Sequence, residues 1–210
     1  MRRTRVKFCG FTRAEDAEQA VALGVDAIGF VCVPGSRRYL EPSRAATLRQ
    51  SLPPFVSVVA LVSNAEAAFV REVIAALRPD LLQYHGQESA AFCEAIGWPY
   101  LKALGMADPA SALASREEHR AARGFLLDSH GADGLGGTGQ GFDWAQVPSD
   151  FDRPWMLAGG LRPETVAGAV TMLRPYAVDV SSGIEAVPGV KDAQKMRAFL
   201  DAVRRADSSP

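Results

Sequence analysis

Gly124-Phe-Leu-Leu-Asp128, followed by Ser-His-Gly131, has the pattern of a buried strand that ends on a carboxylate. Three consecutive apolar residues bounded by glycine and aspartate are typical of a parallel strand covered on both faces. In parallel α/β folds, ligands bind at the carboxyl ends of the strands. Asp128 is therefore a candidate catalytic residue, with an ordinary turn-initiating aspartate as the alternative.

The same strand pattern occurs eight times along the chain, in alternation with helical patterns. The expected strands cover 5–9, 27–33, 55–62, 81–85, 100–104, 124–128, 155–158 and 176–180. This alternation, without a linker or a change of composition, predicts an α/β protein with one compact domain, a (β/α)8 TIM barrel over residues 1–206. Residues 207–210 have the composition of a short disordered tail.

Local signals indicate where the helices begin. Thr12-Arg-Ala-Glu15 has the form of a capping box, and Pro163 suits the first position of a helix. A brief helix is expected over 143–147, and the clearest helical period covers 64–77.

Composition restricts the classes of partner. The chain has 210 residues, 48% of them hydrophobic, and a formal net charge of -1. It has no basic block beyond Arg2, Arg3 and Arg5, and no apolar run near the ~18 residues that a membrane-spanning helix needs. We therefore expect a cytoplasmic protein with a small-molecule partner, bound neither to nucleic acid nor to a membrane.

The three cysteines are Cys9, Cys32 and Cys93. Their odd number and their spacing argue against a disulfide framework or a metal site, so each is expected to be a free thiol.

Two glycine-containing turns follow the last two expected strands. They are Gly159-Gly160, with Arg162 nearby, and Ser181-Ser182-Gly183. In (β/α)8 barrels this pair of loops often binds phosphate through backbone N–H groups. Either turn alone could simply require glycine, but their joint occurrence favours a phosphate site.

Side-chain alternation indicates which groups share the barrel interior. Lys7 and Cys9 are two residues apart on one strand, as are Leu126 and Asp128 on another, so each pair points to one side. The Lys7 ammonium would favour the Cys9 thiolate, and burial beside Leu126 would raise the pKa of Asp128. A base and an acid at one barrel mouth suit proton transfer between adjacent carbons or the opening of a sugar ring. The alternative for Cys9 is a small buried apolar residue.

Eight short motifs occur in order along the chain. They are Lys7-Phe-Cys9-Gly10-Phe-Thr12, Ile28-Gly-Phe30, Ser36-Arg-Arg38-Tyr39, Gln83-Tyr-His85-Gly86, Leu127-Asp128, Gly136-Gly-Thr-Gly139 with Phe142-Asp-Trp144, Ala158-Gly-Gly-Leu161, and Val178-Asp-Val-Ser-Ser-Gly-Ile-Glu185. Together they resemble the phosphoribosylanthranilate isomerase family over essentially the whole chain. The departures are Phe8 and Phe11, where the family more often has smaller aliphatic residues, and Arg162, where an Asn-type cap would be expected.

The resemblance implies an enzyme of tryptophan biosynthesis that converts N-(5-phosphoribosyl)anthranilate to its ribulosyl isomer, an Amadori rearrangement without metal or organic cofactor. Cys9 would be the general base and Asp128 the general acid. Arg38 would bind the anthranilate carboxylate, for which a planar guanidinium is suited, whereas Arg37 would be a solvated loop charge.

The resemblance also implies how the remaining site residues act. The phosphate would lie on Gly160, Ser182 and Gly183 beside Gly159 and Ser181, and the glycines of 136–139, Gly136 and Gly137 among them, would close the mouth. His85 would line the pocket and Asp179 would meet a ribose hydroxyl, unless either is a structural polar group. A monomer and a homodimer both remain open.

Three other interpretations remain. A related sugar isomerase of histidine biosynthesis has a carboxylate at the end of its first strand, and Cys9 argues against it. A Schiff-base aldolase would use Lys7 or Lys102. A non-catalytic phosphosugar-binding protein would have no use for Cys9 together with Asp128.

Overall fold

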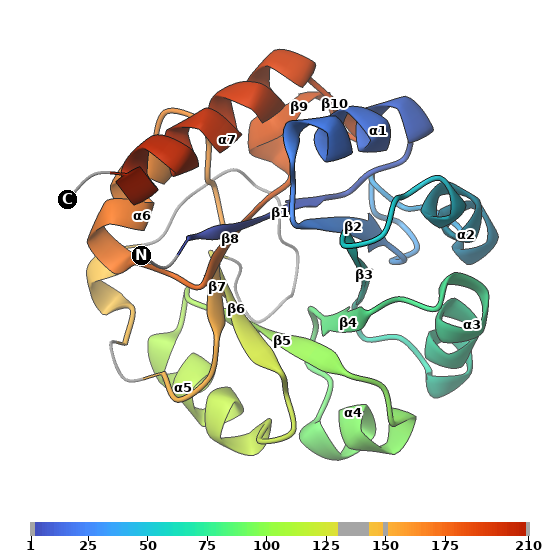
Figure 1. Ribbon diagram of the computed structural model, residues 1–210. Helices are drawn as coiled ribbons and strands as arrows, with labels where there is room; N and C mark the ends of the chain where they lie inside the picture. Colours follow the sequence, from blue (N-terminus) through green and yellow to red (C-terminus); the bar gives the residue numbers. More distant parts are fainter. Residues whose placement is uncertain (1–2, 130–142, 149–150, 209–210) are drawn as a thin grey trace.

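The computed structural model describes residues 3–129, 143–148 and 151–208, which form a closed parallel barrel surrounded by helices (Figure 1). The strands pair in sequence order, and the eighth pairs with the first. They are β1 (Arg5–Cys9), β2 (Ala27–Val31), β3 (Ser57–Val62), β4 (Leu81–Tyr84), β5 (Tyr100–Gly105), β6 (Gly124–Asp128), β7 (Trp155–Leu157) and β8 (Ala177–Val180). The barrel prediction is confirmed.

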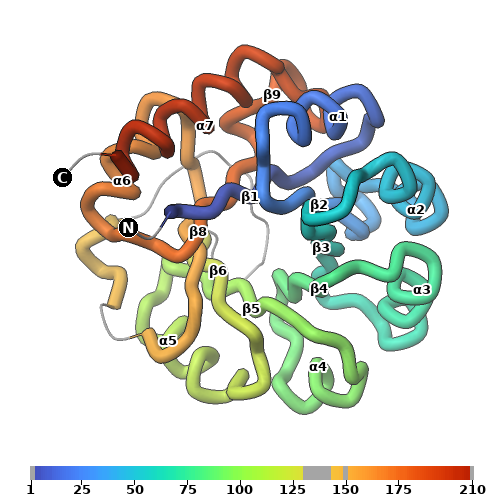
Figure 2. Tube along the Cα trace, in the orientation of Figure 1, coloured from blue at the N-terminus to red at the C-terminus, as the bar shows by residue number. Residues whose placement is uncertain are grey.

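The chain passes once around the ring, so that its last helix lies beside its first (Figure 2). The helices are α1 (Ala14–Leu23), α2 (Pro42–Gln50), α3 (Ala67–Leu77), α4 (Ala90–Ile96), α5 (Pro109–Glu118), α6 (Val166–Leu173) and α7 (Ala193–Ser208). Between β6 and β7, where the sequence predicts a brief helix over 143–147, the described residues form the 3-10 turn η1 (Trp144–Gln146).

The two faces of the strands have different surroundings, as the alternation predicts. Outward residues pack against the helices; Phe8, for example, meets Phe199 of α7 with ring centroids 5.8 Å apart. A separate inward cluster consists of Leu101, Ala103, Leu126, Met156, Ala158 and Ala177. Toward the carboxyl ends of the strands the inward residues become polar, with Lys7 and Asp179 at paired positions of β1 and β8. The barrel therefore has an apolar floor and a polar mouth.

Several helix and strand starts differ from the sequence prediction. α1 begins after Arg13 without a side-chain cap, because the Thr12 hydroxyl instead donates to the carbonyl of Gly189 at 2.6 Å. The predicted capping box is therefore wrong. α6 begins at Val166 rather than at Pro163, since the Arg162 N–H is bound by the Thr165 hydroxyl in a preceding turn. β3 begins at Ser57, because Phe55 has a positive φ of 70° that no strand residue adopts.

A short hairpin that the sequence did not predict lies between β8 and α7. It follows the 3-10 turn η2 (Ser182–Ile184) and consists of β9 (Glu185–Val187) and β10 (Val190–Lys191), which pair antiparallel. Gly189 turns the chain with a φ of 84°, a conformation that favours glycine. Strands this short give too little alternation to be found in a sequence.

The predicted tail at 207–210 is wrong for its first two residues, because α7 continues to Ser208. The Asp207 carboxylate accepts hydrogen bonds from the N–H and the hydroxyl of Thr4, at 2.8 and 2.7 Å. These bonds tie the last helix to the start of the chain. Residues 209–210 lie outside the described residues.

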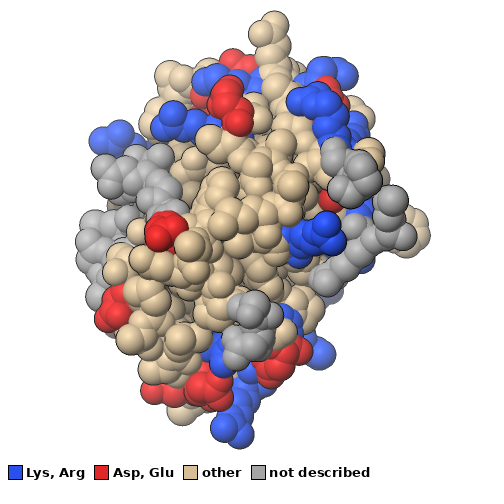
Figure 3. Space-filling model, turned by 90° about the vertical axis from the view of Figure 1, so that its left-hand side faces the viewer, with Lys and Arg blue, Asp and Glu red and all other residues tan. Residues whose placement is uncertain are grey.

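Figure 3 views the side on which α6 lies in Figure 1, and the centre of that face is largely uncharged. The eight residues of α6 carry no charge, and Met172 is 61% exposed on it. Within the described ranges, no helix is long and apolar enough to cross a membrane.

Candidate active site

Cys9 and Asp128 are the last residues of β1 and β6, and both are buried at the barrel mouth. Their side chains point inward, because Phe8 and Leu127 before them pack outward against the helices. The thiol of Cys9 and the carboxyl of Asp128 therefore both face the barrel interior.

His85 follows β4 and lies beside Asp128. Its Nε2 is 3.7 Å from Asp128 Oδ2, and its Nδ1 is 3.1 Å from the amide nitrogen of the fully buried Gln83. The sequence left His85 as a pocket residue or a structural one. The geometry brings His85 to the proposed acid and shows that Gln83, which had no predicted role, supports the imidazole.

Lys7 and Asp179 form a buried ion pair on neighbouring strands, with Nζ 2.9 Å from Oδ1. Burial alone would lower the pKa of Lys7, but Asp179 and Cys9 together raise it. The carboxylate of Asp179 is also within electrostatic reach of Asp128. The pair therefore lies between the thiol and the acid.

The surroundings of Cys9 act in opposite directions on the ionisation of its thiol. Burial raises the pKa of Cys9 above its ordinary value of 9.0, although the charges of Lys7 and Lys191 oppose the shift. The predicted effect of Lys7 has the right sign, but desolvation outweighs it. Gly29 of β2 leaves space for the sulfur, since a Cβ there would lie 2.6 Å from Sγ.

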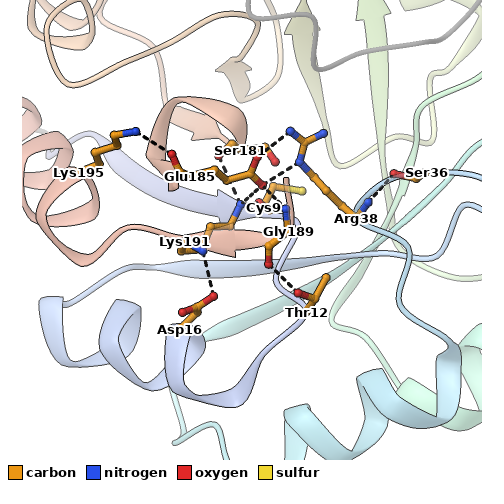
Figure 4. A network of polar contacts seen from close by, with 10 residues as sticks. All are labelled: Cys9, Thr12, Asp16, Ser36, Arg38, Ser181, Glu185, Gly189, Lys191 and Lys195. Carbon is orange, nitrogen blue, oxygen red and sulfur yellow. Dashed lines mark hydrogen bonds and ion pairs between the residues drawn. The ribbon is translucent and has the colours of Figure 1, made fainter. Parts of the chain in front are cut away.

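Arg38 follows β2 and is held by Glu185, a carboxylate for which no role was predicted. Its Nε and Nη2 donate to the two carboxylate oxygens of Glu185, each at 2.8 Å. Lys191 donates from the other side to Glu185 Oε1 at 2.9 Å and to the carbonyl of Cys9 at 2.6 Å (Figure 4). Arg37 is exposed, as expected for a solvated loop charge.

The two glycine-containing turns lie against each other at the mouth. A Cβ on Gly183 would lie 2.0 Å from the carbonyl oxygen of Leu161, which follows Gly159 and Gly160. Both Gly159 and Gly160 have positive φ, at 79° and 66°. Ser181 Oγ is buried without a hydrogen-bond partner among the described residues. Gly136 and Gly137 lie outside the described residues.

A family model for N-(5'-phosphoribosyl)anthranilate (PRA) isomerase matches residues 6–202 of the chain.

The chain belongs to the PRA isomerase family.

Relatives and solved structures agree with this assignment. The chain is 50% identical to N-(5'-phosphoribosyl)anthranilate isomerase of Stenotrophomonas maltophilia (strain R551-3) over 207 residues, which cover 98% of this chain and 95% of the relative. The crystal structure of the Thermus thermophilus enzyme matches with a TM-score of 0.86 and 37% identity, over 96% of this chain and 99% of the other. The structure of a PRA isomerase in complex with reduced 1-(o-carboxyphenylamino)-1-deoxyribulose 5-phosphate matches with a TM-score of 0.82 and 34% identity, over the same shares.

The lysines do not support aldolase chemistry in this PRA isomerase family member. Lys102 lies between the inward residues Leu101 and Ala103, so it points outward, where its Nζ donates to the carbonyl of Gly86 and lies 3.4 Å from Glu88. Lys7 points inward, but its raised pKa is the opposite of what a Schiff-base lysine requires. Within the residues that the structure describes, no group of three or more His, Cys, Asp or Glu side chains could hold a metal ion.

Proposed function

We propose that the chain converts N-(5'-phosphoribosyl)anthranilate to 1-(2-carboxyphenylamino)-1-deoxyribulose 5-phosphate in tryptophan biosynthesis, with Asp128 as general acid and Cys9 as general base. The observation that carries this proposal is the burial of both groups at one barrel mouth, with the Lys7–Asp179 pair between them. Family membership supports the same substrate. We expect catalysis without a cofactor and a cytoplasmic location.

The reaction needs one proton donated and one removed. Asp128 would protonate the furanose ring oxygen, so that the C1–O bond breaks and an iminium ion forms. The thiolate of Cys9 would then remove the proton from C2, and the resulting enolamine would tautomerise to the ketone. The product is an isomer of the substrate, which balances the protons.

The proposed binding residues contact three parts of the substrate. Arg38 would bind the benzoate carboxylate, because its guanidinium is half-buried beside Cys9. Backbone N–H groups of the two glycine-containing turns would bind the phosphate, through Gly159, Gly160, Ser181, Ser182 and Gly183. Asp179 would meet a ribose hydroxyl and His85 would line the pocket.

The experiment that tests this function is fluorescence-monitored conversion of freshly made N-(5'-phosphoribosyl)anthranilate by the purified chain. Turnover by the wild type, lost in a Cys9→Ser/Asp128→Asn double variant, is the expected result. Binding of the substrate without turnover by the wild type would instead indicate a non-catalytic phosphosugar-binding protein.

For the assembly we propose a homodimer through the amino-terminal face of the barrel. Phe55 is fully exposed there, and it borders a cavity of about 430 Å³ that is also lined by Val59, Leu81 and Tyr176. Around a two-fold axis, Phe55 of each copy would enter the cavity of the other. A structural neighbour, with a TM-score of 0.84 and 34% identity, consists of monomers generated from the dimeric phosphoribosylanthranilate isomerase of Thermotoga maritima.

A further inference from the structure

Among the described residues, the carboxylate of Glu185 holds the guanidinium of Arg38 along one side. The bonds to Glu185 use Nε and one hydrogen of Nη2, which is the lateral edge of the guanidinium. Figure 4 shows the terminal nitrogens of Arg38 and the amine of Lys191 on opposite sides of the Glu185 carboxylate. A guanidinium has five N–H donors, so Nη1 and Nη2 can still donate one hydrogen bond each to the two oxygens of a second carboxylate.

Glu185 is itself fixed from several directions. Its Oε1 accepts from the Lys191 ammonium at 2.9 Å and from the N–H of Gly189 at 3.2 Å, and its own carbonyl accepts from Lys195 at 2.7 Å. Burial alone would raise the pKa of Glu185, but the bonds from Arg38 and Lys191 lower it. The carboxylate therefore stays charged and has one fixed orientation.

Lys191 connects this carboxylate to the strand ends of the active site. Its fully buried ammonium also donates to the carbonyls of Cys9 at 2.6 Å and of Ser181 at 3.3 Å. The stem of Arg38 lies against Gly10, where a Cβ would be 2.6 Å from Arg38 Cδ. Glu185 thus holds the guanidinium and Gly10 packs against the stem, and neither contact uses Nη1.

We propose that Glu185, anchored by Lys191, is a positioning residue that presents the Nη1–Nη2 edge of Arg38 to the carboxylate of the substrate. The inference rests on the proposed role of Arg38. One carboxylate between two cations leaves a single positive charge, which matches the single negative charge of a benzoate. Glu185 thereby selects for substrates with a carboxylate ortho to the amine, without touching them.

The test measures kcat and KM of four proteins with two substrates. The proteins are the wild type, Glu185→Gln, Arg38→Met and the double variant, and the substrates are the phosphoribosyl adducts of anthranilate and of aniline. Glutamine has nearly the shape of glutamate but would present a neutral amide to Nε and Nη2 of Arg38. We expect Glu185→Gln to raise KM for the anthranilate adduct ~10-fold, with kcat changed less than ~3-fold, because a charge-assisted pair no longer orients the binding group.

Two comparisons separate positioning from a general structural effect. With the aniline adduct, Glu185→Gln should change KM by less than ~2-fold. In the Arg38→Met background, Glu185→Gln should raise KM for the anthranilate adduct little further, since the effects of coupled residues are not additive. Equal KM changes with both adducts, or additive effects with Arg38→Met, would overturn the proposal. Glu72→Gln on the exposed face of α3 is the matched control and should behave as the wild type.

The outcomes distinguish the proposed role of Arg38 from the proposed role of Glu185. An unchanged KM in Arg38→Met would remove the carboxylate role of Arg38, and the positioning role with it. A raised KM in Arg38→Met with an unchanged KM in Glu185→Gln would remove the positioning role alone. If Glu185→Gln does not fold by circular dichroism, Glu185→Asp keeps the charge but is one methylene too short to reach both nitrogens. A wild-type KM in that variant would equally contradict the proposal.

Discussion

Cys9 and Asp128 could be identified from the sequence because each is the last residue of an apolar strand. The proposed roles of the two residues rest on this position and on the family resemblance, and not on residue type alone. Glu185 and Lys191 could not be assigned in the same way. The Arg38–Glu185 contact joins residues 147 positions apart, and no local pattern reports such a pair.

Replacement of either reacting group should slow the chemical step. We expect Cys9→Ser and Asp128→Asn each to lower kcat by at least ~10²-fold, because each variant loses one general acid or base. Steady-state kinetics measure this, with circular dichroism to confirm the fold. Near-normal turnover in both variants would refute the assignment.

The ionisation of Cys9 should be visible in the ligand-free protein. Because burial raises the pKa of Cys9 above its ordinary value, the thiolate forms only in alkaline solution, and base catalysis by the free enzyme should keep increasing with pH into that range. The measurement is a thiolate absorbance titration of the wild type minus that of Cys9→Ser. Cys32 and Cys93, with pKa values of about 12, remain protonated over most of this range. A difference titration with its midpoint below 9.0 would contradict the expectation.

Among the elements, the strands were predicted most accurately and the helix starts least. Each strand is a short run of residues that is buried on both faces, and this pattern recurs along the chain, whereas a helix start depends on one or two side chains with competing partners. Thr12 is the clearest case, because its hydroxyl bonds to the β9–β10 hairpin rather than to α1. A tertiary contact there overrides the local signal.

The contact between the two glycine-containing turns allows no side chain at Gly183. We expect Gly183→Ala to lower the free energy of unfolding by ~1–3 kcal/mol and to raise KM, because the added methyl group would displace the backbone at Leu161. Urea denaturation and steady-state kinetics measure the two effects. Gly168→Ala is the control: its Cβ would meet nothing within 4 Å, and alanine in α6 should stabilise the protein by ~0.5–1 kcal/mol. Equal stability changes in the two variants would show that the contact is unimportant.

At the scale of the whole molecule, the strand count and the single domain followed from a pattern repeated along the entire chain. The amino-terminal face of the barrel was not predicted, because an exposed Phe55 next to a cavity arises from how the strand starts are arranged in space. The same limit applies to the oligomeric state, which the sequence left open.

The proposed dimer should depend on Phe55. We expect Phe55→Ser to convert a dimer into a monomer, because the substitution removes a large apolar side chain that is fully exposed beside the cavity. Sedimentation equilibrium of both proteins measures the mass. Met172→Ser on α6 is the control, because this substitution also removes an exposed apolar side chain, but on another face. A monomeric wild type would refute the proposal.

Lys191 donates to the carbonyl of Cys9 and lies in a hairpin that follows all eight barrel strands along the chain. A nascent chain therefore carries its thiol, its acid and its arginine long before the support for two of them exists. These groups would reach their final geometry only after the hairpin has been synthesised, so products truncated before Lys191 should be inert even when they contain Cys9, Arg38 and Asp128.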